Sequence, residues 1–399
     1  MVNVFTNKSF LTIPLDDLPD EILARVMSNR LRNMAVSRRF ASIKPKPRVW
    51  AKLMSVRDVR ELAHMLGMGL VDVMGMSVLF REDEVDRDDG VCRAMVGMLR
   101  MCLPQCRSLR GIRMGNYFKD ISILEDEGAA LLAPALRQCP LLEQLSLVNC
   151  GITNNSVFSL ATAISNMPRL RILNLSHNNI EYDGVKSLVA SLSHCKQLED
   201  LDLYNNGIRN EGVMGLTTLL SQCPSLRKLN LGGNYIGGEG VARLAAVLPL
   251  CPLLENMVLT SIGFDEWPGV LQPLAVVLPR CPMLTELDIS HSALDLESTM
   301  ALAEAIPQCV NLDTLMIEMC YIDQDSVGVL AAAFARAPRL RYVDMRHNNF
   351  SDATLLFEVS ETRVPTIEIE WESDSEDNES DNNSYGHSDS EYSDSDGGG

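Results

Sequence analysis

Apolar residues recur at a nearly fixed interval along most of the chain. Eight segments follow the template Leu-x-x-Leu-x-Leu, with Met, Ile or Val in place of a later leucine in the last four. Successive segments start 28 residues apart, except for one interval of 30. A period between about 20 and 50 residues indicates stacked supersecondary units, each of which buries its apolar face only against its neighbours. The pattern therefore predicts a solenoid, a class of fold that usually binds partners. The segments begin at Leu142, Leu170, Leu198, Leu226, Leu254, Leu284, Leu312 and Leu340.

The repeat that begins at Leu198 shows how each unit is built. Its two later leucines alternate with polar residues, which is the period of a β-strand. Asn206 follows, where its amide can satisfy the backbone groups of a turn. From Gly212 onward the apolar residues recur with helical spacing, and Cys223-Pro224 ends the helix because proline disfavours helical geometry in the residue before it. We expect each unit to be a strand, a turn and a helix.

The residue at the turn position differs among the repeats. Ile262 breaks the polar pattern, and it lies in the 30-residue repeat, which also contains Trp267-Pro268. We expect a local irregularity there, and a tolerated surface insertion explains it better than a binding bulge. In chain order, the turn position holds Cys150, Asn178, Asn206, Asn234, Ile262, Ser292, Cys320 and Asn348.

Less regular units flank these eight repeats. Upstream, a strand unit begins at Leu109, and a weaker one is expected within residues 71–79. Downstream, a last strand unit begins at Val364. Terminal repeats are atypical because they cap the core. We therefore predict about eleven strand units in total.

The 28-residue period, with room for full helices, resembles that of the ribonuclease-inhibitor class of leucine-rich-repeat proteins. The resemblance covers roughly residues 70 to 370. It implies an α/β solenoid shaped like a horseshoe, with parallel strands on the inner face and helices outside. We place the leucine-rich-repeat domain at residues 54–371, and we expect it to bind a protein.

The net charge of −18 is concentrated at the C-terminus. From Glu368 onward the chain has twelve acidic residues and no Lys or Arg, which leaves −6 for the rest. Residues 372–399 cannot bury enough apolar surface to offset the entropy of ordering, so we expect a disordered acidic tail. Two interpretations of this tail stay open: it keeps the protein soluble, or it regulates binding through serine phosphorylation or a basic partner.

Residues 14–53 do not follow the repeat, and residues 1–13 before them are expected to be flexible. Pro19 near a first helical position, with Asp20 and Glu21 in the first turn, predicts the start of a helix. One face of that helix would carry Leu18, Ile22, Leu23 and Val26.

Three parts of this segment, taken in order, resemble an F-box. They are Leu18-Pro19, Val36-Ser37-Arg38-Arg39-Phe40 and Trp50-x-x-Leu53. Ser37 and Phe40 replace the commoner cysteine and tryptophan, and the stretch between Met27 and Leu31 is several residues shorter than in the family. The alternative is an amphipathic helical cap on the solenoid. The resemblance implies docking onto a Skp-family adaptor of a cullin ubiquitin ligase, with candidate docking residues Leu18, Pro19, Ile22, Leu23, Val26 and Val36.

The strand residues between the leucines should face the concave side of the horseshoe, because side chains alternate along a strand. Aromatic and charged groups on a rigid curved sheet are typical of protein interfaces. The set leans acidic, which favours a partner with a basic surface. Our candidate partner-binding residues are Asp200, Asp202, Tyr204, Lys228, Asn230, Glu286, Asp288, His291, Glu318, Tyr342, Asp344 and Arg346.

The eleven cysteines predict neither disulfides nor a zinc site. Most of them recur at two fixed positions of the repeat, and no Cys-x-x-Cys pair occurs. A thiol at a recurring buried position behaves as a small hydrophobic group. We therefore expect structural thiols and a reducing compartment, the cytoplasm or the nucleus.

The sequence contains no residue pattern that is typical of a catalytic or cofactor-binding site. The histidines His177, His291 and His347 lie beside the turn position, where solvated strand-end residues are expected. The chain has no phosphate-binding glycine loop, no basic stripe for nucleic acid and no run of about 18 apolar residues. We expect no cofactor, no metal, no nucleic-acid or membrane partner and no enzymatic activity.

Our leading hypothesis is a substrate-recognition subunit of a cullin-type ubiquitin ligase, in which the repeats bind the target and the F-box-like segment binds the adaptor. One alternative resembles the Ran GTPase-activating proteins, which also join such repeats to an acidic tail. That alternative lacks the family's Arg-Asn-Arg-like turn and leaves residues 14–53 unexplained. A second alternative is a non-enzymatic scaffold.

Overall fold

The computed structural model describes residues 2–6, 9–13, 48–53, 62–63, 66, 72–79, 89–115, 124–262, 269–363 and 366–371. Three predictions fall outside these ranges. They concern the acidic tail at 372–399, the six adaptor-docking candidates between Leu18 and Val36, and the Trp267-Pro268 insertion.

One sheet runs the whole length of the described chain, and from β3 to β14 its strands follow each other in sequence order. Each strand from β3 to β14 pairs in parallel with the next. At the N-terminal end, β1 (Val2–Thr6) and β2 (Ser9–Ile13) form an antiparallel hairpin, and β1 pairs antiparallel with β3. The parallel strands are β3 (Arg48–Leu53), β4 (Asp72–Leu79), β5 (Gly111–Gly115), β6 (Gln144–Val148), β7 (Ile172–Asn174), β8 (Asp200–Asp202), β9 (Lys228–Asn230), β10 (Asn256–Val258), β11 (Glu286–Asp288), β12 (Thr314–Met316), β13 (Tyr342–Asp344) and β14 (Glu368–Glu370).

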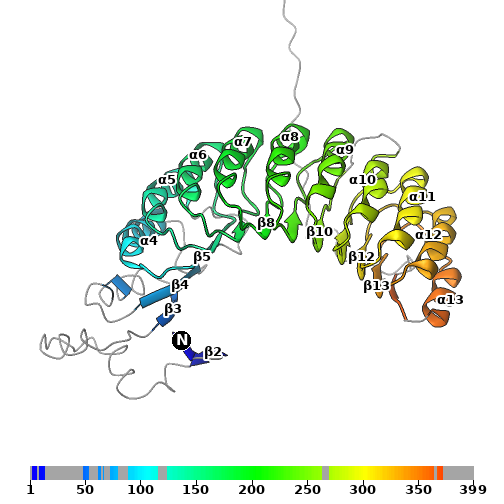
Figure 1. The fold of residues 1–399 in the computed structure, drawn as a ribbon, viewed down its shortest axis with the longest axis horizontal. Helices are drawn as coiled ribbons and strands as arrows, with labels where there is room; N and C mark the ends of the chain where they lie inside the picture. The colour runs from blue at the N-terminus through cyan, green and yellow to red at the C-terminus, as the bar shows by residue number, and fades with distance from the viewer. Residues whose placement is uncertain are drawn as a thin grey trace, which may run out of the picture.

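Helices line the outer side of this sheet, so that the chain forms an arc with strands inside and helices outside (Figure 1). Short 3-10 turns, η2 (Leu103–Gln105), η3 (Leu248–Leu250), η4 (Leu278–Arg280) and η5 (Ile306–Gln308), follow four of the helices. The helices are α4 (Asp89–Cys102), α5 (Glu125–Leu136), α6 (Asn154–Ile164), α7 (Tyr182–Leu192), α8 (Arg209–Leu220), α9 (Gly238–Val247), α10 (Gln272–Val277), α11 (Leu296–Ala305), α12 (Gln324–Arg336) and α13 (Thr354–Thr362).

The leucines of the repeat template form the core between the sheet and the helices. In the repeat that starts at Leu198, that residue, Leu201 and Leu203 are all fully buried. A single apolar cluster extends from Leu53 in β3 to Ile367 just before β14. The predicted solenoid of strand, turn and helix units is confirmed, because each unit buries its apolar face against its neighbours.

A ladder of buried asparagine side chains joins consecutive turns. The Oδ1 atom of Asn348 accepts the backbone N–H groups of Cys320 (2.9 Å) and Ile322 (3.1 Å), one repeat upstream. Its Nδ2 atom donates to the carbonyl oxygens of Ile317 (2.9 Å) and Met345 (2.8 Å). A buried backbone group without a partner is costly, so this side chain holds two repeats together. We call Asn178, Asn206, Asn234 and Asn348 the asparagine ladder.

The residue before each of the eight turn positions has a positive φ, between 50° and 67°. Asparagine and glycine adopt this left-handed geometry most readily. The three histidines at this position are therefore turn residues, which agrees with their predicted place at the strand ends. The eight residues are Asn149, His177, Asn205, Gly233, Ser261, His291, Met319 and His347.

The structure extends the predicted strand set at its N-terminal end. All eleven predicted strand units are present as β4 to β14, and β3 is a further parallel strand. We had assigned Trp50 and Leu53 to the end of a helical segment, but the structure has both in β3. Valine and tryptophan favour strands, and pairing with β4 satisfies the backbone of this segment. The sheet thus continues across the boundary that we drew after residue 53.

The repeat that contains Ile262 is irregular, as expected. Its helix α10 spans only six residues, whereas the neighbouring helices α9 and α11 span ten each. Isoleucine at the turn position has no polar atom to continue the asparagine ladder. The ladder is therefore interrupted between Asn234 and Ser292, whose Oγ atom accepts the Ile262 N–H at 3.2 Å.

Candidate protein-binding site on the concave face

Every predicted partner-binding residue lies on a parallel strand or within three residues after one. The middle residue of each of the strands β8 to β12 is buried, and the residues on both sides of it are more exposed. The strands lie on the inner side of the arc (Figure 1). This alternation therefore turns the flanking side chains toward the concave surface. We call Asp200, Asp202, Tyr204, Lys228 and Asn230 the β8–β9 group, and Glu286, Asp288, His291, Glu318, Tyr342, Asp344 and Arg346 the β11–β13 group.

The last residue of most of these strands has a backbone role that sequence reasoning missed. Its side-chain oxygen accepts the N–H of the residue two positions later, as Asp202 does for Tyr204 at 3.0 Å. Asn or Asp is suited to this position because a short side-chain oxygen can reach that N–H. Part of the acidic character of the concave face therefore belongs to the turn. The same bond occurs at Asn174 (2.9 Å), Asn230 (3.1 Å), Asp288 (3.0 Å) and Asp344 (3.1 Å).

The β8–β9 group is partly buried and tightly connected. Asp202 accepts a hydrogen bond from Asn174 at 2.8 Å, and the Tyr204 ring lies 5.0 Å from the His177 ring. Burial raises the pKa of Asp200, and Asp202 adds to this shift while Lys228 opposes it. Burial also raises the pKa of Asp202, despite its hydrogen bond from the Tyr204 N–H.

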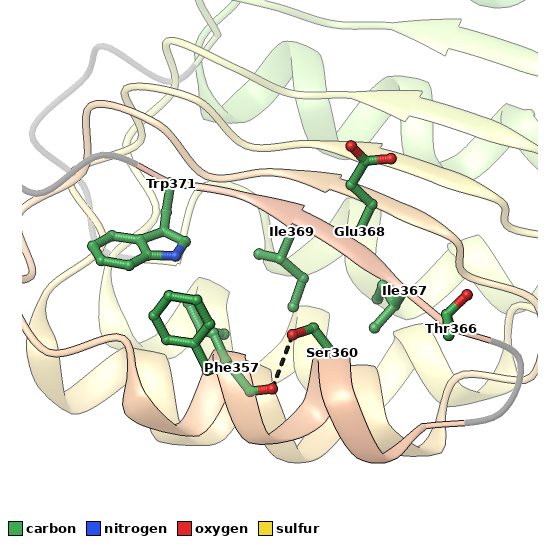
Figure 2. Close-up of a pocket in the computed structure, with 8 residues that line it drawn as sticks. Phe357, Ser360, Thr366, Ile367, Glu368, Ile369 and Trp371 are labelled. Atoms are coloured by element: carbon green, nitrogen blue, oxygen red, sulfur yellow. Dashed lines mark hydrogen bonds between the residues drawn. The ribbon is translucent and has the colours of Figure 1, made fainter.

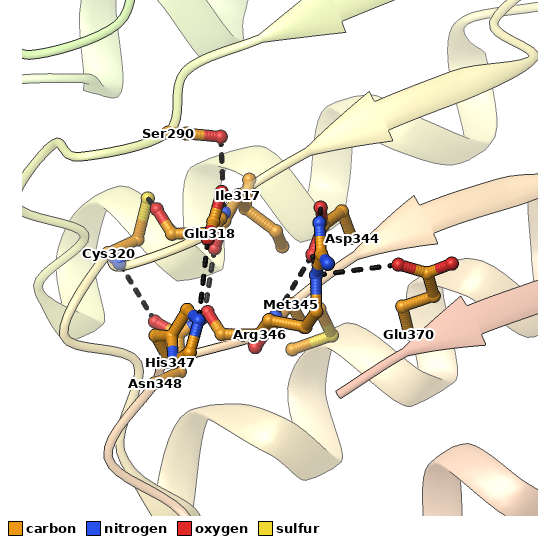
Figure 3. Close-up of polar contacts among 10 residues, drawn as sticks. All are labelled: Ser290, Ile317, Glu318, Cys320, Asp344, Met345, Arg346, His347, Asn348 and Glu370. Atoms are coloured by element: carbon orange, nitrogen blue, oxygen red, sulfur yellow. Dashed lines mark hydrogen bonds and ion pairs between the residues drawn. The ribbon is translucent and has the colours of Figure 1, made fainter. Parts of the chain in front are cut away.

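The β11–β13 group centres on a paired arginine, and Figure 3 shows its surroundings. Arg346 donates two hydrogen bonds to Asp344, at 3.0 and 2.6 Å, and lies 3.4 Å from a carboxylate oxygen of Glu370. Burial alone would raise the pKa of Asp344, but the bonds from Arg346 lower it overall. Burial and a hydrogen bond with Glu370 raise the pKa of Tyr342 to about 12. Glu370 on β14 is thus part of this surface, although we did not predict it.

Acidic side chains outnumber basic ones around this group. Glu318 is held by its backbone, whose N–H donates to Ser290 Oγ at 3.2 Å, and its carboxylate lies 3.7 Å from His347. Arg346 is the basic side chain among the predicted residues of this group. The resulting surface is negatively charged, and its acidic members are Glu286, Asp288, Glu318, Asp344, Glu368 and Glu370.

Two small residues, Gly232 and Thr260, lie between the two groups. A Cβ atom on Gly232 would lie 2.1 Å from the Thr260 hydroxyl, so only glycine fits there. That hydroxyl is buried and has no hydrogen-bond partner among the described residues. The space above Gly232 is therefore filled by Thr260 and by the edge of the Tyr204 ring.

A row of ion pairs runs along the start of the strands, and sequence reasoning missed it too. Arg171 pairs with Glu199 through two hydrogen bonds, at 2.9 and 2.7 Å, from one repeat to the next. Positive and negative residues alternate at this position, directly after the first leucine, from Arg110 to Glu255, and Thr285 interrupts the series before Asp313 and Arg341. The pairs are Arg110 with Glu143, Arg171 with Glu199, Arg227 with Glu255 and Arg341 with Asp313.

The described cysteine side chains are buried and unbridged, as predicted. Burial raises the pKa of Cys139, Cys195 and Cys281 to about 11 and that of Cys251 and Cys309 to about 12. A thiol with so high a pKa is almost wholly protonated near neutral pH and is a poor nucleophile.

The described ranges offer no group of three or more His, Cys, Asp or Glu side chains arranged to hold a metal ion. Within the same ranges, no helix combines the length and the apolar character needed to cross a membrane.

A comparison with protein-family models agrees with this architecture. A family model described as Leucine Rich repeat matches residues 167–189, 194–216, 222–245 and 280–303. The comparison with curated proteins gives no match. Among solved structures, the tropomodulin C-terminal domain of Caenorhabditis elegans has 21% sequence identity and a TM-score of 0.33, over 37% of this chain and 92% of that chain. An internalin (inlF) of Listeria monocytogenes has 16% identity and a TM-score of 0.35, over 67% of this chain and 82% of that chain.

The matched segments all lie within the regular repeats. Together with the parallel strands that alternate with outer helices, they establish the fold as an α/β leucine-rich-repeat solenoid. Its repeats indicate a role in binding other proteins.

Proposed function

We propose that the chain is a non-enzymatic substrate-recognition subunit of a cullin-type ubiquitin ligase. In this proposal, the concave face binds a target protein, and the F-box-like segment at residues 14–53 binds a Skp-family adaptor. The observation that carries the binding half of the proposal is the acidic surface on β11 to β14, where only two of the six carboxylates, those of Asp344 and Glu370, pair with Arg346. The adaptor half depends on the F-box-like residues that begin at Leu18-Pro19.

The acidic surface supports a target with a basic segment. Asp344 is 5% exposed and is already neutralised by Arg346, so it shapes the surface more than it attracts ligands. Glu286, Glu318 and Glu370 are only partly buried and are better placed to meet a Lys or Arg side chain. Such charges steer association and select partners more than they add affinity.

A pull-down of the full chain with a Skp-family adaptor tests the adaptor half. We expect the wild-type chain to retain the adaptor, and Leu23→Asp to abolish retention because it places a charge on the docking face. The matched control is Leu296→Asp, which changes a leucine that is 51% exposed on α11. Failure of the wild-type chain to bind, or equal binding by Leu23→Asp, would contradict the ligase assignment.

Affinity purification with mass spectrometry tests the target half. The variant Glu286→Lys/Glu318→Lys reverses two charges of the concave surface, and Glu211→Lys/Glu304→Lys reverses two exposed charges on α8 and α11. We expect the first variant alone to lose basic partners. Equal recovery by both variants would count against the concave face.

The alternatives give different results in these experiments. A scaffold retains protein partners but binds no adaptor. An activator of the Ran GTPase stimulates GTP hydrolysis, which a single hydrolysis assay with Ran detects. Stimulation in that assay would replace the ligase proposal.

A further inference from the structure

The sheet of the solenoid ends at β14, the last strand in the described sheet. The Glu368 N–H donates to the Arg341 carbonyl at 2.7 Å, and the Glu370 carbonyl accepts the Met345 N–H at 2.8 Å, at the two ends of β13. In a parallel ladder, alternate residues bond to opposite sides. The N–H and C=O groups of Ile369 therefore point toward the outer edge of the sheet, where internal strands bond the next repeat. One example is the bond from the Leu203 N–H to the Asn230 carbonyl, at 2.9 Å.

A pocket lined by apolar residues and by Ser360, Thr366 and Glu368 lies beside this edge. It has a volume of about 380 Å³ and opens between α13 and β14 (Figure 2). Ile367 and Ile369 point from the strand toward the helix, and Leu356 and Phe357 line the helical side. In an internal repeat, the next repeat covers the corresponding side of the core.

Aromatic rings at the mouth of the pocket remain accessible. Phe357 is 53% exposed and meets Trp371 edge-on, with ring centroids 5.4 Å apart. Leu355 on the same helix is 48% exposed. Large exposed apolar groups beside a pocket mark a site for a side chain of a partner.

The charges around the pocket define what can bind there. Glu368 and Glu370 alternate with the apolar residues of β14, and Glu358 and Glu361 are exposed on α13. The chain that follows Trp371 reads Glu-Ser-Asp-Ser-Glu-Asp and would place like charges against the same edge. Like charges directly opposite each other destabilise strand pairing. Charge thus disfavours the tail and favours a basic strand.

We propose that the open edge of β14 and the pocket beneath it bind an extended segment of another protein, in which Lys or Arg residues alternate with apolar residues. The segment adds a strand to the sheet through the backbone of Ile369, as edge strands do in β-augmentation. Its apolar side chains enter the pocket beside Phe357, and its basic side chains lie on the concave side beside Glu368 and Glu370. This proposal does not depend on the proposed adaptor-docking residues.

The test uses the full chain and a fluorescein-labelled peptide, Gly-Lys-Val-Lys-Leu-Lys-Val-Gly, in a fluorescence anisotropy titration. We expect saturable binding, and about tenfold weaker binding to Glu368→Lys, which loses one attraction and gains one repulsion. Glu211→Lys on α8 is the matched control and should bind as the wild type does. A second variant, Phe357→Ser, should also weaken binding, and its thermal melting curve shows whether the cap remains folded.

A second experiment tests whether the peptide pairs with β14 through its backbone. Two further peptides carry N-methyl groups either on the lysines or on the apolar residues, which blocks the N–H groups on one edge of the peptide or the other. Strand addition predicts that one of the two loses binding at least about tenfold while the other keeps it. Equal effects of both N-methylated peptides, or equal binding to Glu368→Lys and wild type, would overturn the proposal. Displacement of the basic peptide by a synthetic peptide of residues 372–399 would also overturn it, because the tail would then be the occupant.

Discussion

The Oδ1 atom of Asn234 accepts the backbone N–H of Asn206, which lies one full repeat upstream, at 2.9 Å. The same oxygen accepts the N–H of Ile208 at 3.3 Å. The Nδ2 atom of Asn234 donates to the carbonyl groups of Leu203 (2.8 Å) and Leu231 (2.9 Å). One fully buried side chain therefore satisfies backbone groups of two consecutive repeats. This explains why a polar residue recurs within an otherwise apolar core.

The variant Asn234→Ala should lower the free energy of unfolding by about 3 kcal/mol, because several buried backbone groups lose their partners together. Urea denaturation followed by circular dichroism measures the change. The control Asn166→Ala removes an exposed amide that bonds only within its own helix end, to the Thr162 carbonyl. That control should change stability by less than about 0.5 kcal/mol; equal losses in the two variants would refute the role of the ladder.

The ion pair between Arg171 and Glu199 should contribute little on its own. A double-mutant cycle with Arg171→Gln and Glu199→Gln is expected to give a coupling energy of about 0.5 kcal/mol, since both side chains are partly exposed. The coupling should fall as salt is raised, because screening acts on exposed charges. A coupling that stays constant in high salt would show that the pair acts through packing.

The buried carboxyl group of Asp202 should make stability depend on pH. Burial raises the pKa of Asp202 in the folded state, so folding favours its protonated form. The stability that the protonated group contributes is fully present below the unfolded pKa and is lost as the pH rises through the folded pKa. The variant Asp202→Asn keeps an oxygen that can accept the Tyr204 N–H and removes that loss. It should therefore gain stability over the wild type at pH 7, on the order of 0.5 kcal/mol, and less at pH 3.

Urea denaturation at the two pH values measures this difference. Glu304→Gln on α11, an exposed position, serves as the control and should show no comparable change between pH 3 and pH 7. If Asp202→Asn is less stable than the wild type at pH 7, the charge is needed for its bond with Asn174.

The buried thiols should resist modification in the folded protein. Burial raises the pKa of Cys251 to about 12, three units above the ordinary value of 9.0, so its thiolate fraction at pH 8 falls about 1000-fold. Ellman's reagent should therefore react slowly with the described cysteines in buffer and rapidly in denaturant. Fast reaction at Cys251 in the native protein, identified by mass spectrometry, would show that the repeats open locally.

The sequence predicted the repeats well because the leucine period depends on local alternation that each unit repeats. The strand β3 was assigned to a helical segment, since a single terminal strand has no second copy to establish a register. The concave residues from Asp200 to Arg346 followed from alternation alone. Their contacts did not, because the pairing of Arg346 with Glu370 joins β14 to β13 across a shorter, atypical repeat.

Two structural roles were present in the sequence but needed the parallel register to be interpreted. Arg171 and Glu199 occupy the same position in successive repeats, and only the pairing of β7 with β8 brings them together. Likewise, Asp202 precedes Tyr204 by two residues, but the sequence does not show that the Asp202 carboxylate accepts the Tyr204 N–H. Residues 14–47, on which the adaptor proposal depends, lie outside the described residues, and that prediction awaits the pull-down.

The interruption of the asparagine ladder at Ile262 has a mechanical consequence. At every ladder asparagine the amide ties its repeat to the one before, and this tie is missing between the repeats of β9 and β10, where the Thr260 hydroxyl also lacks a partner. Because a solenoid transmits load only between neighbours, a chain stretched from its two ends would part first between β9 and β10. A force-extension measurement would then show two separate unfolding events, one for each half of the arc.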